Sequence, residues 1–228
     1  MRQESLTWAR LRAPKAAAIA GIVFSVLLII SFVLILKSVP ADSREGGAWL
    51  ATNGNSILLA LNLVPFAGIA FLWFIGVVRD RLGSQEDQFF ATVFLGSGLL
   101  FLALLFVLTA IEGSIILLYL AQPNRIIASS YYDFGRTVSH HLMNAYALKM
   151  AGVFMISTST VFIRTRVIPK WMAILGYVLA AIMLLRVDHI DQLGWISLTF
   201  PLWILLISIY ILIDNYRKTR SSASAKLQ

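Results

Sequence analysis

The 32 residues 89–120, FFATVFLGSGLLFLALLFVLTAIEGSIILLYL, decide the fold of this chain. They contain a single charged residue, Glu112. About 20 consecutive apolar residues are enough for a helix that crosses the roughly 30 Å of hydrocarbon in a bilayer. Because the backbone in lipid has to satisfy its own hydrogen bonds, a run of this kind predicts a transmembrane helix.

The composition of the whole chain agrees with this run. Of the 228 residues, 59% are hydrophobic and 13% are charged, and the mean hydropathy is +0.81. A soluble domain normally carries about 25% charged residues. The chain has no cysteine, which excludes disulfides, thiolate metal sites and cysteine nucleophiles. These features predict an all-α, polytopic transmembrane helical bundle.

Six apolar segments are predicted to cross the membrane, at about 16–36, 54–78, 89–120, 142–163, 170–187 and 195–213. A cytoplasmic segment (1–15) precedes them, and we expect residues 214–228 to form a disordered cytoplasmic tail. The third segment is too long, because its 32 residues would reach about 48 Å as one helix. Either this helix is strongly tilted, or one of its ends continues past the lipid.

The distribution of lysine and arginine predicts the orientation. Of the 19 basic residues, 13 fall in the termini and loops of one side and 5 in the loops of the other, and Lys149 lies within a span. Cytoplasmic loops collect basic residues, so we expect both termini to be cytoplasmic. In a soluble protein the net charge of +8 would suggest nucleic-acid binding. In this chain the excess of basic residues in the predicted cytoplasmic loops explains the net charge. We therefore expect the lipid bilayer, not nucleic acid, as the partner.

Ionisable residues inside spans are costly in lipid and often mark functional sites. The sequence has two such residues, Glu112 in the third span and Lys149 in the fourth. These spans are consecutive and antiparallel, so the two side chains are expected to be neighbours. They would form either a proton- or ion-responsive pair on a substrate path or a structural salt bridge. Alternatively, they snorkel separately toward the interface.

Asn62 is a third polar candidate, in the second span. With Pro65 it would open the helix and offer a carbonyl to a polar ligand. The alternative is that its amide hydrogen-bonds to a neighbouring helix. Small residues that let helices approach closely are expected to serve packing. These are Ala67, Gly68, Gly76, Gly96, Gly98, Gly176 and Ala180.

All three histidines of the chain fall in predicted external loops, near carboxylates. The group comprises Asp133, His140, His141, Asp188, His189 and Asp191. Histidine and carboxylate ligands suit zinc and similar ions, so the group is a candidate external metal or proton site. No spacing matches a metal motif, and solvated loop residues are the alternative. No nucleotide or catalytic motif is visible, so no cofactor is expected.

Residues 61–103, LNLVPFAGIAFLWFIGVVRDRLGSQEDQFFATVFLGSGLLFLA, resemble an uncharacterised family of small bacterial polytopic membrane proteins with about six spans. The resemblance implies a bacterial inner membrane and no particular activity. The most distinctive part is the predicted cytoplasmic turn between residues 79 and 90. It carries the charged residues Arg79, Asp80, Arg81, Glu86 and Asp87. This turn is either a contact site for a partner or a solvated hairpin whose charges pair with one another.

Three functions compete at this point. The first is a small transporter or channel-like subunit with a polar site near Glu112 and Lys149. The second is a non-catalytic assembly or regulatory subunit that binds another membrane protein or a second copy. The third, an intramembrane enzyme, is the weakest, because no nucleophile, base and metal ligands converge in the sequence. A bundle with a polar path to Glu112 would favour the first, and a closed bundle would favour the second.

Overall fold

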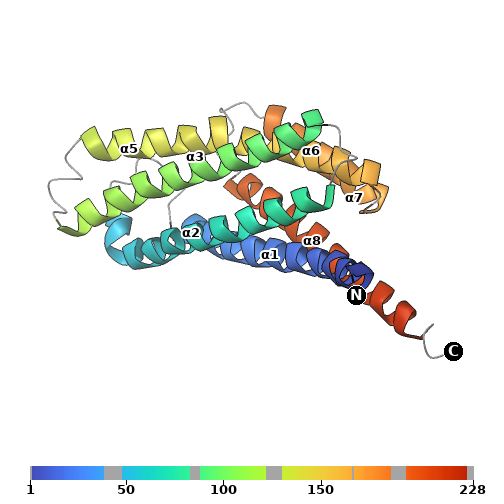
Figure 1. Cartoon of the computed structure of the whole chain (residues 1–228). Coiled ribbons are helices and arrows are strands. Elements are labelled where there is room, and N and C mark those ends of the chain that lie inside the picture. Colours follow the sequence, from blue (N-terminus) through green and yellow to red (C-terminus); the bar gives the residue numbers. More distant parts are fainter. Residues whose placement is uncertain are drawn as a thin grey trace.

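The structure, a computed structural model, describes residues 2–38, 48–82, 88–121, 130–165, 167–185 and 194–224 (Figure 1). Every regular element in these ranges is a helix. The elements are α1 (Arg2–Ser38), α2 (Ala48–Leu82), α3 (Gln88–Ala121), α5 (Ser130–His141), the π-helix η2 (Leu142–Ala147), α6 (Leu148–Thr165), α7 (Lys170–Leu185), the 3-10 helix η3 (Gly194–Leu198) and α8 (Thr199–Ser224). The prediction of an all-α helical bundle is confirmed.

Five stretches are long and apolar enough to cross a membrane. They are Lys15–Ser38, Thr52–Arg79, Phe89–Ala121, Tyr131–Thr165 and Trp195–Arg217. The remaining predicted span, 170–187, corresponds to the shorter apolar helix α7 of 16 residues. At 1.5 Å per residue α7 is about 24 Å long, a little less than the hydrocarbon thickness. The chain is therefore a multi-pass membrane protein.

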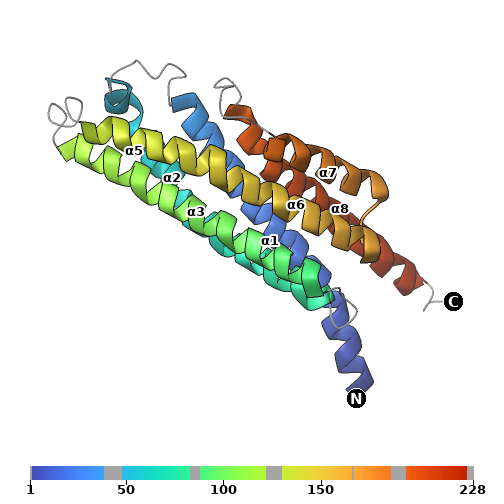
Figure 2. The same ribbon diagram turned by 90° about the horizontal axis from the view of Figure 1, so that it is seen from above.

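Both chain ends lie at the same end of the bundle (Figures 1 and 2). Basic side chains stack on aromatic rings there. Lys15 lies 5.1 Å from the ring centroid of Tyr216, and Arg164 lies 4.8 Å from that of Phe90. These lysine and arginine residues belong to the larger of the two basic groups in the sequence. The shared end fits an even number of crossings, and its cytoplasmic location stays a prediction from the charge bias.

Neighbouring helices in the bundle run antiparallel (Figure 2). Helix α1 packs along α2 and α8, and α3 lies between α2 and the continuous rod formed by α5, η2 and α6. Helix α7 packs mainly on α6. It begins directly after Pro169, whose carbonyl accepts a hydrogen bond from the Met172 amide at 3.1 Å. Proline is favoured at the start of a helix because its missing N–H has no partner to lose there.

The overlong third segment is one helix of 34 residues. Figure 2 shows the ends of α2, α3 and α5 projecting past the ends of α1 and α7. We call residues 48–61, 110–121 and 130–141 the extension, and Ile35 near the end of α1 packs against it. It has a small core of its own, separate from the main core of the bundle. This core consists of Ile57, Leu61, Ile116, Tyr119 and Tyr132. The structure contains no membrane, so both explanations given above, a strong tilt and an end that continues past the lipid, stay predictions.

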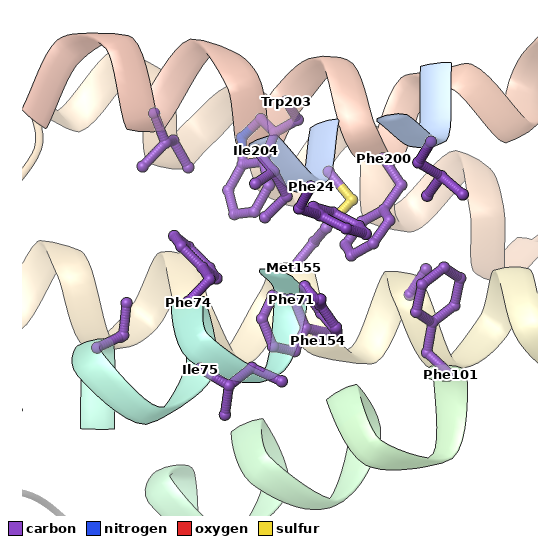
Figure 3. Packing of buried hydrophobic residues seen from close by; sticks show 14 of the residues in the cluster. Phe24, Phe71, Phe74, Ile75, Phe101, Phe154, Met155, Phe200, Trp203 and Ile204 are labelled. Carbon is purple, nitrogen blue, oxygen red and sulfur yellow. The ribbon is translucent and has the colours of Figure 1, made fainter. Parts of the chain in front are cut away.

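Aromatic rings fill the centre of the bundle (Figure 3). The ring centroid of Phe71 lies 4.5 Å from that of Phe24, 5.2 Å from that of Phe154 and 5.9 Å from those of Phe101 and Phe200. These five residues come from α1, α2, α3, α6 and α8. Each of the five is at most 1% exposed. The helices are thus joined by a continuous aromatic contact at mid-bundle.

Three of the predicted packing glycines, Gly68, Gly98 and Gly176, allow close helix contacts. A Cβ on Gly98 would lie 2.7 Å from Ile75 Cδ1, and one on Gly176 would lie 2.6 Å from Trp203 Cζ2. At both positions a neighbouring helix occupies the space that a side chain would need. By contrast, a Cβ on Gly76 or on Gly96 would meet nothing within 4 Å. The packing prediction therefore applies to some of these positions and not to others.

Candidate functional site

Glu112 lies on α3 and is half-buried against α5. Its carboxylate interacts electrostatically with the guanidinium of Arg136 and lies within reach of the Ser139 hydroxyl. The contact with Ser139 falls short of full hydrogen-bond geometry, because Ser139 Oγ is buried without a hydrogen-bond partner. We call Glu112, Arg136 and Ser139 the polar cluster.

The sequence of α5 places these groups against α3. Tyr132, Arg136 and Ser139 are spaced i, i+4 and i+7, so they share one face of the helix. This face is buried, since Tyr132 is 7% and Ser139 is 3% exposed. A Cβ on Gly135 would lie 2.5 Å from Ile115 Cδ1 of α3. Only glycine lets α5 approach so closely, and this approach brings Arg136 and Ser139 to Glu112.

The cluster combines one carboxylate, one guanidinium and one hydroxyl. Glu112 and Arg136 carry opposite charges and are both half-buried. Among the described residues the base beside Ser139 is the Glu112 carboxylate, which also interacts with Arg136. The arrangement is suited to holding a polar or charged group by hydrogen bonds and charge. It offers little for nucleophilic catalysis, which needs a nucleophile oriented by a dedicated base.

The structure does not bring Lys149 to Glu112. Because α3 and the rod are antiparallel, Glu112 faces Ser139, while Phe94 stacks on Phe154 with centroids 4.8 Å apart. Lys149 lies ten residues beyond Ser139 on the rod, or about 15 Å further along the bundle at 1.5 Å per residue. The expected pairing of these two residues is therefore wrong in this structure. Lys149 is half-buried on α6, toward the aromatic centre.

Asn62 lies at the same level as Glu112 but points outward. The residues next to them in the two helices show this. Leu61 precedes Asn62, Gly113 follows Glu112, and a Cβ on Gly113 would lie 3.8 Å from Leu61 Cδ1. Asn62 itself is exposed, and the helix continues through Pro65 without opening. Asn62 is thus on the surface of the bundle and does not join the polar cluster.

The candidate external metal or proton site is only partly within the described ranges. Asp188, His189 and Asp191 lie outside them. His140 and His141 are exposed at the end of α5, with ring centroids 6.1 Å apart, and Asp133 is exposed two turns earlier. Over the described ranges, no three histidine or acidic residues are close enough to hold a metal ion.

The charged turn is likewise only partly described. Helix α2 ends at Leu82, so Arg79, Asp80 and Arg81 are helical, and Arg79 is exposed. Glu86 and Asp87 fall outside the described residues. A partner contact at this turn stays a prediction.

Sequence reasoning missed Arg136 and Ser139 as the neighbours of Glu112. It placed residues 121–141 in an external loop, and this is wrong for residues 130–141, which form α5. The signal was present in the spacing of Tyr132, Arg136 and Ser139, since i, i+4 and i+7 mark one helical face.

No family model, curated protein or solved structure matches this chain. The resemblance of residues 61–103 to small bacterial membrane proteins therefore stays a prediction, and so does a bacterial inner membrane.

Proposed function

We propose that this chain is a non-catalytic membrane component that works by assembling with a second copy of itself through the outward face of α2. Two observations support this proposal. The centre of the bundle is filled, and a polar amide faces outward from an apolar span. The second observation carries the proposal.

The filled centre argues against a polar path along the axis of one protomer. At the level of Phe71, rings from five helices are in contact, and Trp203 and Met155 pack beside them (Figure 3). Apolar side chains at native packing density leave few voids larger than a water molecule. A solute that crosses the bundle at this level would have to displace this core. The closed bundle was the arrangement expected of an assembly component.

The outward amide is Asn62. It follows the apolar residues 57–61 and precedes an apolar stretch that continues to residue 78. It lies nine residues, or about 13 Å, closer to the bundle centre than Asn53, whose amide donates to the Ser38 carbonyl at the end of α1 (3.0 Å). No described residue hydrogen-bonds to the Asn62 amide. An unpaired amide in hydrocarbon costs about 2–7 kcal/mol, and this short side chain cannot snorkel to water.

The surroundings of Asn62 form a surface suited to another helix. Leu59, Phe66, Ile69 and Trp73 lie on the same face at helical spacing, and they are 53–67% exposed. Aromatic and aliphatic side chains of this kind pack against other helices, and an amide among them hydrogen-bonds across the contact. We call this surface the α2 face.

A second copy is the occupant that this surface fits. A side-chain amide is both donor and acceptor, so two Asn62 side chains can satisfy each other. A two-fold axis along the membrane normal brings the same residue of each copy to the same depth, as closed dimers require. A different partner would need an amide or hydroxyl of its own at that depth. The self-complementary chemistry of Asn62 therefore favours the dimer.

The test is the monomer–dimer equilibrium in lipid bilayers, measured by single-molecule photobleaching at varied protein density. The proposal expects Asn62→Leu to weaken the dimer about 3- to 30-fold, the range for interhelical hydrogen bonds of about 0.6–2 kcal/mol. Asn55→Leu is the matched control, because Asn55 lies on the same face two turns nearer the helix start and should leave the dimer intact. A monomeric wild type, or equal effects of both changes, would refute the proposal.

A small transporter or channel-like subunit is the second candidate, and Lys149 is the observation that favours it. This cation is half-buried on α6, close to the aromatic centre. Intramembrane cations mark ion or substrate paths in many membrane proteins. Flux of protons and small ions into proteoliposomes, compared between the wild type and Lys149→Met, tests this candidate. Flux that Lys149→Met abolishes would favour transport over the assembly role.

A further inference from the structure

The rod that runs from α5 to α6 contains the π-helix η2 at Leu142–Ala147. The Leu148 amide donates to the carbonyl of Met143, five residues earlier, where an α-helix would use the carbonyl four residues earlier. The side-chain amide of Asn144 donates to the His140 carbonyl at 3.1 Å and so bridges the start of this segment. A turn closed over five residues holds one residue more than an α-helical turn. The rod therefore carries about one surplus residue in η2.

The surplus residue brings both halves of the rod into register with α3. Gly135 of α5 lies against Ile115 of α3, because a Cβ on this glycine would be 2.5 Å from Ile115 Cδ1. Phe154 of α6 stacks on Phe94 of α3, with ring centroids 4.8 Å apart. Gly135 and Phe154 are 19 residues apart, whereas residues that share one face of an α-helix over five turns are about 18 apart. In an uninterrupted α-helix they would point about 100° apart, so both face α3 because η2 takes up one residue.

The same spacing holds along the buried face of the rod. The buried residues of α5 are Tyr132, Gly135 and Ser139, and the residues 19 positions later, Ala151, Phe154 and Thr158, are buried as well. Without the surplus, the residues 18 positions earlier than this α6 group would face α3. These are Asp133, Arg136 and His140. In the structure Asp133 and His140 are exposed and Arg136 is half-buried, so the surplus keeps the charged side of α5 from turning fully toward α3.

The difference between the two faces of α5 is large in physical terms. The part of α3 that lies against Gly135 is formed by Ile111 and Ile115. In an uninterrupted helix Arg136 would replace the glycine at this contact, where even a Cβ has no room. Asp133 and His140 would turn toward the same helix, and burying a charged group is costly unless it is paired. The π turn thus allows the close packing of α5 on α3.

We propose that η2 is a register device, whose surplus residue turns α5 by about 100° and so selects the face of α5 that packs on α3. The selected face has Gly135 at its centre. Asp133, Thr137 and His140 are thereby presented on the outer surface of the extension. The device acts between α5 and α3, and it does not depend on dimerisation through the α2 face.

Removing one residue from η2 tests the proposal. Deletion of Ala145 shortens the spacing of Gly135 and Phe154 from 19 to 18 residues, so an uninterrupted α-helix would then keep both on α3. Docking is measured by the disulfide between Ile115→Cys and Gly135→Cys, which needs Cα atoms about 4.4–6.8 Å apart. We expect the deletion to keep the disulfide yield in native membranes after mild oxidation. The thermal unfolding midpoint of the purified full chain should stay within about 4 °C of that of the undeleted cysteine pair.

Two other deletions in the same cysteine-pair background are the controls. Deletion of Asn144 together with Ala145 removes one residue too many and turns α5 by about 100° the other way, so the disulfide should be lost. Deletion of Val107 removes an exposed residue of α3 between Gly98 and Ile115, where the helix is α-helical and has no surplus to give up. It should lose the disulfide too. Loss of the disulfide on deletion of Ala145 alone, or its retention in either control, would overturn the proposal.

Discussion

Replacing Phe154 with alanine tests whether the centre of the bundle is filled. The Phe154 ring is fully buried, and its centroid lies 4.8 Å from that of Phe94, 5.2 Å from that of Phe71 and 5.8 Å from that of Phe200. It joins α6 to α2, α3 and α8 at mid-bundle. The substitution opens a cavity where these four helices meet and changes no charge.

Two terms determine how much free energy of unfolding this substitution removes: the transfer energy of the lost ring and the cavity that it leaves. In a soluble protein the change costs about 3–5 kcal/mol, because the lost transfer energy and the cavity add. Between helices in lipid the transfer term is nearly absent, since lipid tails are as apolar as the side chain. A cavity of about 100 Å³, at about 24 cal/mol per Å³, leaves about 2.4 kcal/mol. Loss of the ring contacts, stacked with Phe94 and edge-to-face with Phe200, adds about 0.5 kcal/mol or more. We expect a loss of about 2–3 kcal/mol in the free energy of unfolding.

Steric trapping in bilayer nanodiscs measures this free energy without strong denaturant. Phe134→Ala is the matched control, because the same change at a 69% exposed position leaves no cavity and should cost less than about 1 kcal/mol. Equal small losses for the two variants would show that the centre is loosely packed or hydrated. A polar path through one protomer would then be compatible with the bundle.

Two further predictions concern helix packing and register. Gly176→Ala should cost about 1–3 kcal/mol in the same assay, because the new Cβ would lie 2.6 Å from Cζ2 of the buried Trp203 indole; an unchanged stability would mean that α7 is not packed as described. In double-mutant cycles, Glu112→Gln and Arg136→Met should couple by at least about 0.5 kcal/mol, whereas Glu112→Gln and Lys149→Met should be additive within that value. A coupling of Glu112 to Lys149 as large as that to Arg136 would contradict the antiparallel register described here.

Hydropathy alone was enough to predict most of the fold. A run such as residues 89–120 has no stable alternative to a helix in lipid, so the prediction needs no knowledge of tertiary contacts. The extension was harder to predict. Residues 130–141 contain Asp133, Arg136 and two histidines, so the hydropathy of this segment by itself is too low to indicate a span. Its helical form depends on packing against α3, which the periodicity of Tyr132, Arg136 and Ser139 indicates only once a partner face is known.

The error in the candidate site has the same origin. With residues 121–141 treated as a loop, the register between the third and fourth spans was free, and Glu112 could be placed beside Lys149. Because α3 continues to Ala121 and α5 begins at Ser130, the connection is short and fixes the register. Ser139 then faces Glu112, and Lys149 lies about 15 Å away along the bundle. The prediction that Glu112 is a polar site within a span needed only composition, whereas the identity of its neighbours needed the helix boundaries.

The outward position of Asn62 could not be read from the sequence either. The residues of α2 are apolar on all sides, so periodicity does not separate the face toward α1 and α3 from the face toward lipid. The structure separates them, since Phe71 and Phe74 are fully buried while Phe66 and Trp73 are 63% and 67% exposed. Asn62 lies on the exposed side. A polar residue that looked like an internal site is thus a surface residue, and this position motivates the assembly proposal.

Cysteine cross-linking in native membranes tests that proposal most directly, because the chain has no cysteine of its own. Phe66→Cys places one thiol on the α2 face, a turn from the retained Asn62, and Val178→Cys places one on the exposed side of α7 as a control. A disulfide needs Cα atoms about 4.4–6.8 Å apart, so only residues at a close contact form it readily. We expect mild oxidation to give a covalent dimer with Phe66→Cys and not with Val178→Cys. A dimer with Val178→Cys alone, or with neither, would contradict assembly through the α2 face.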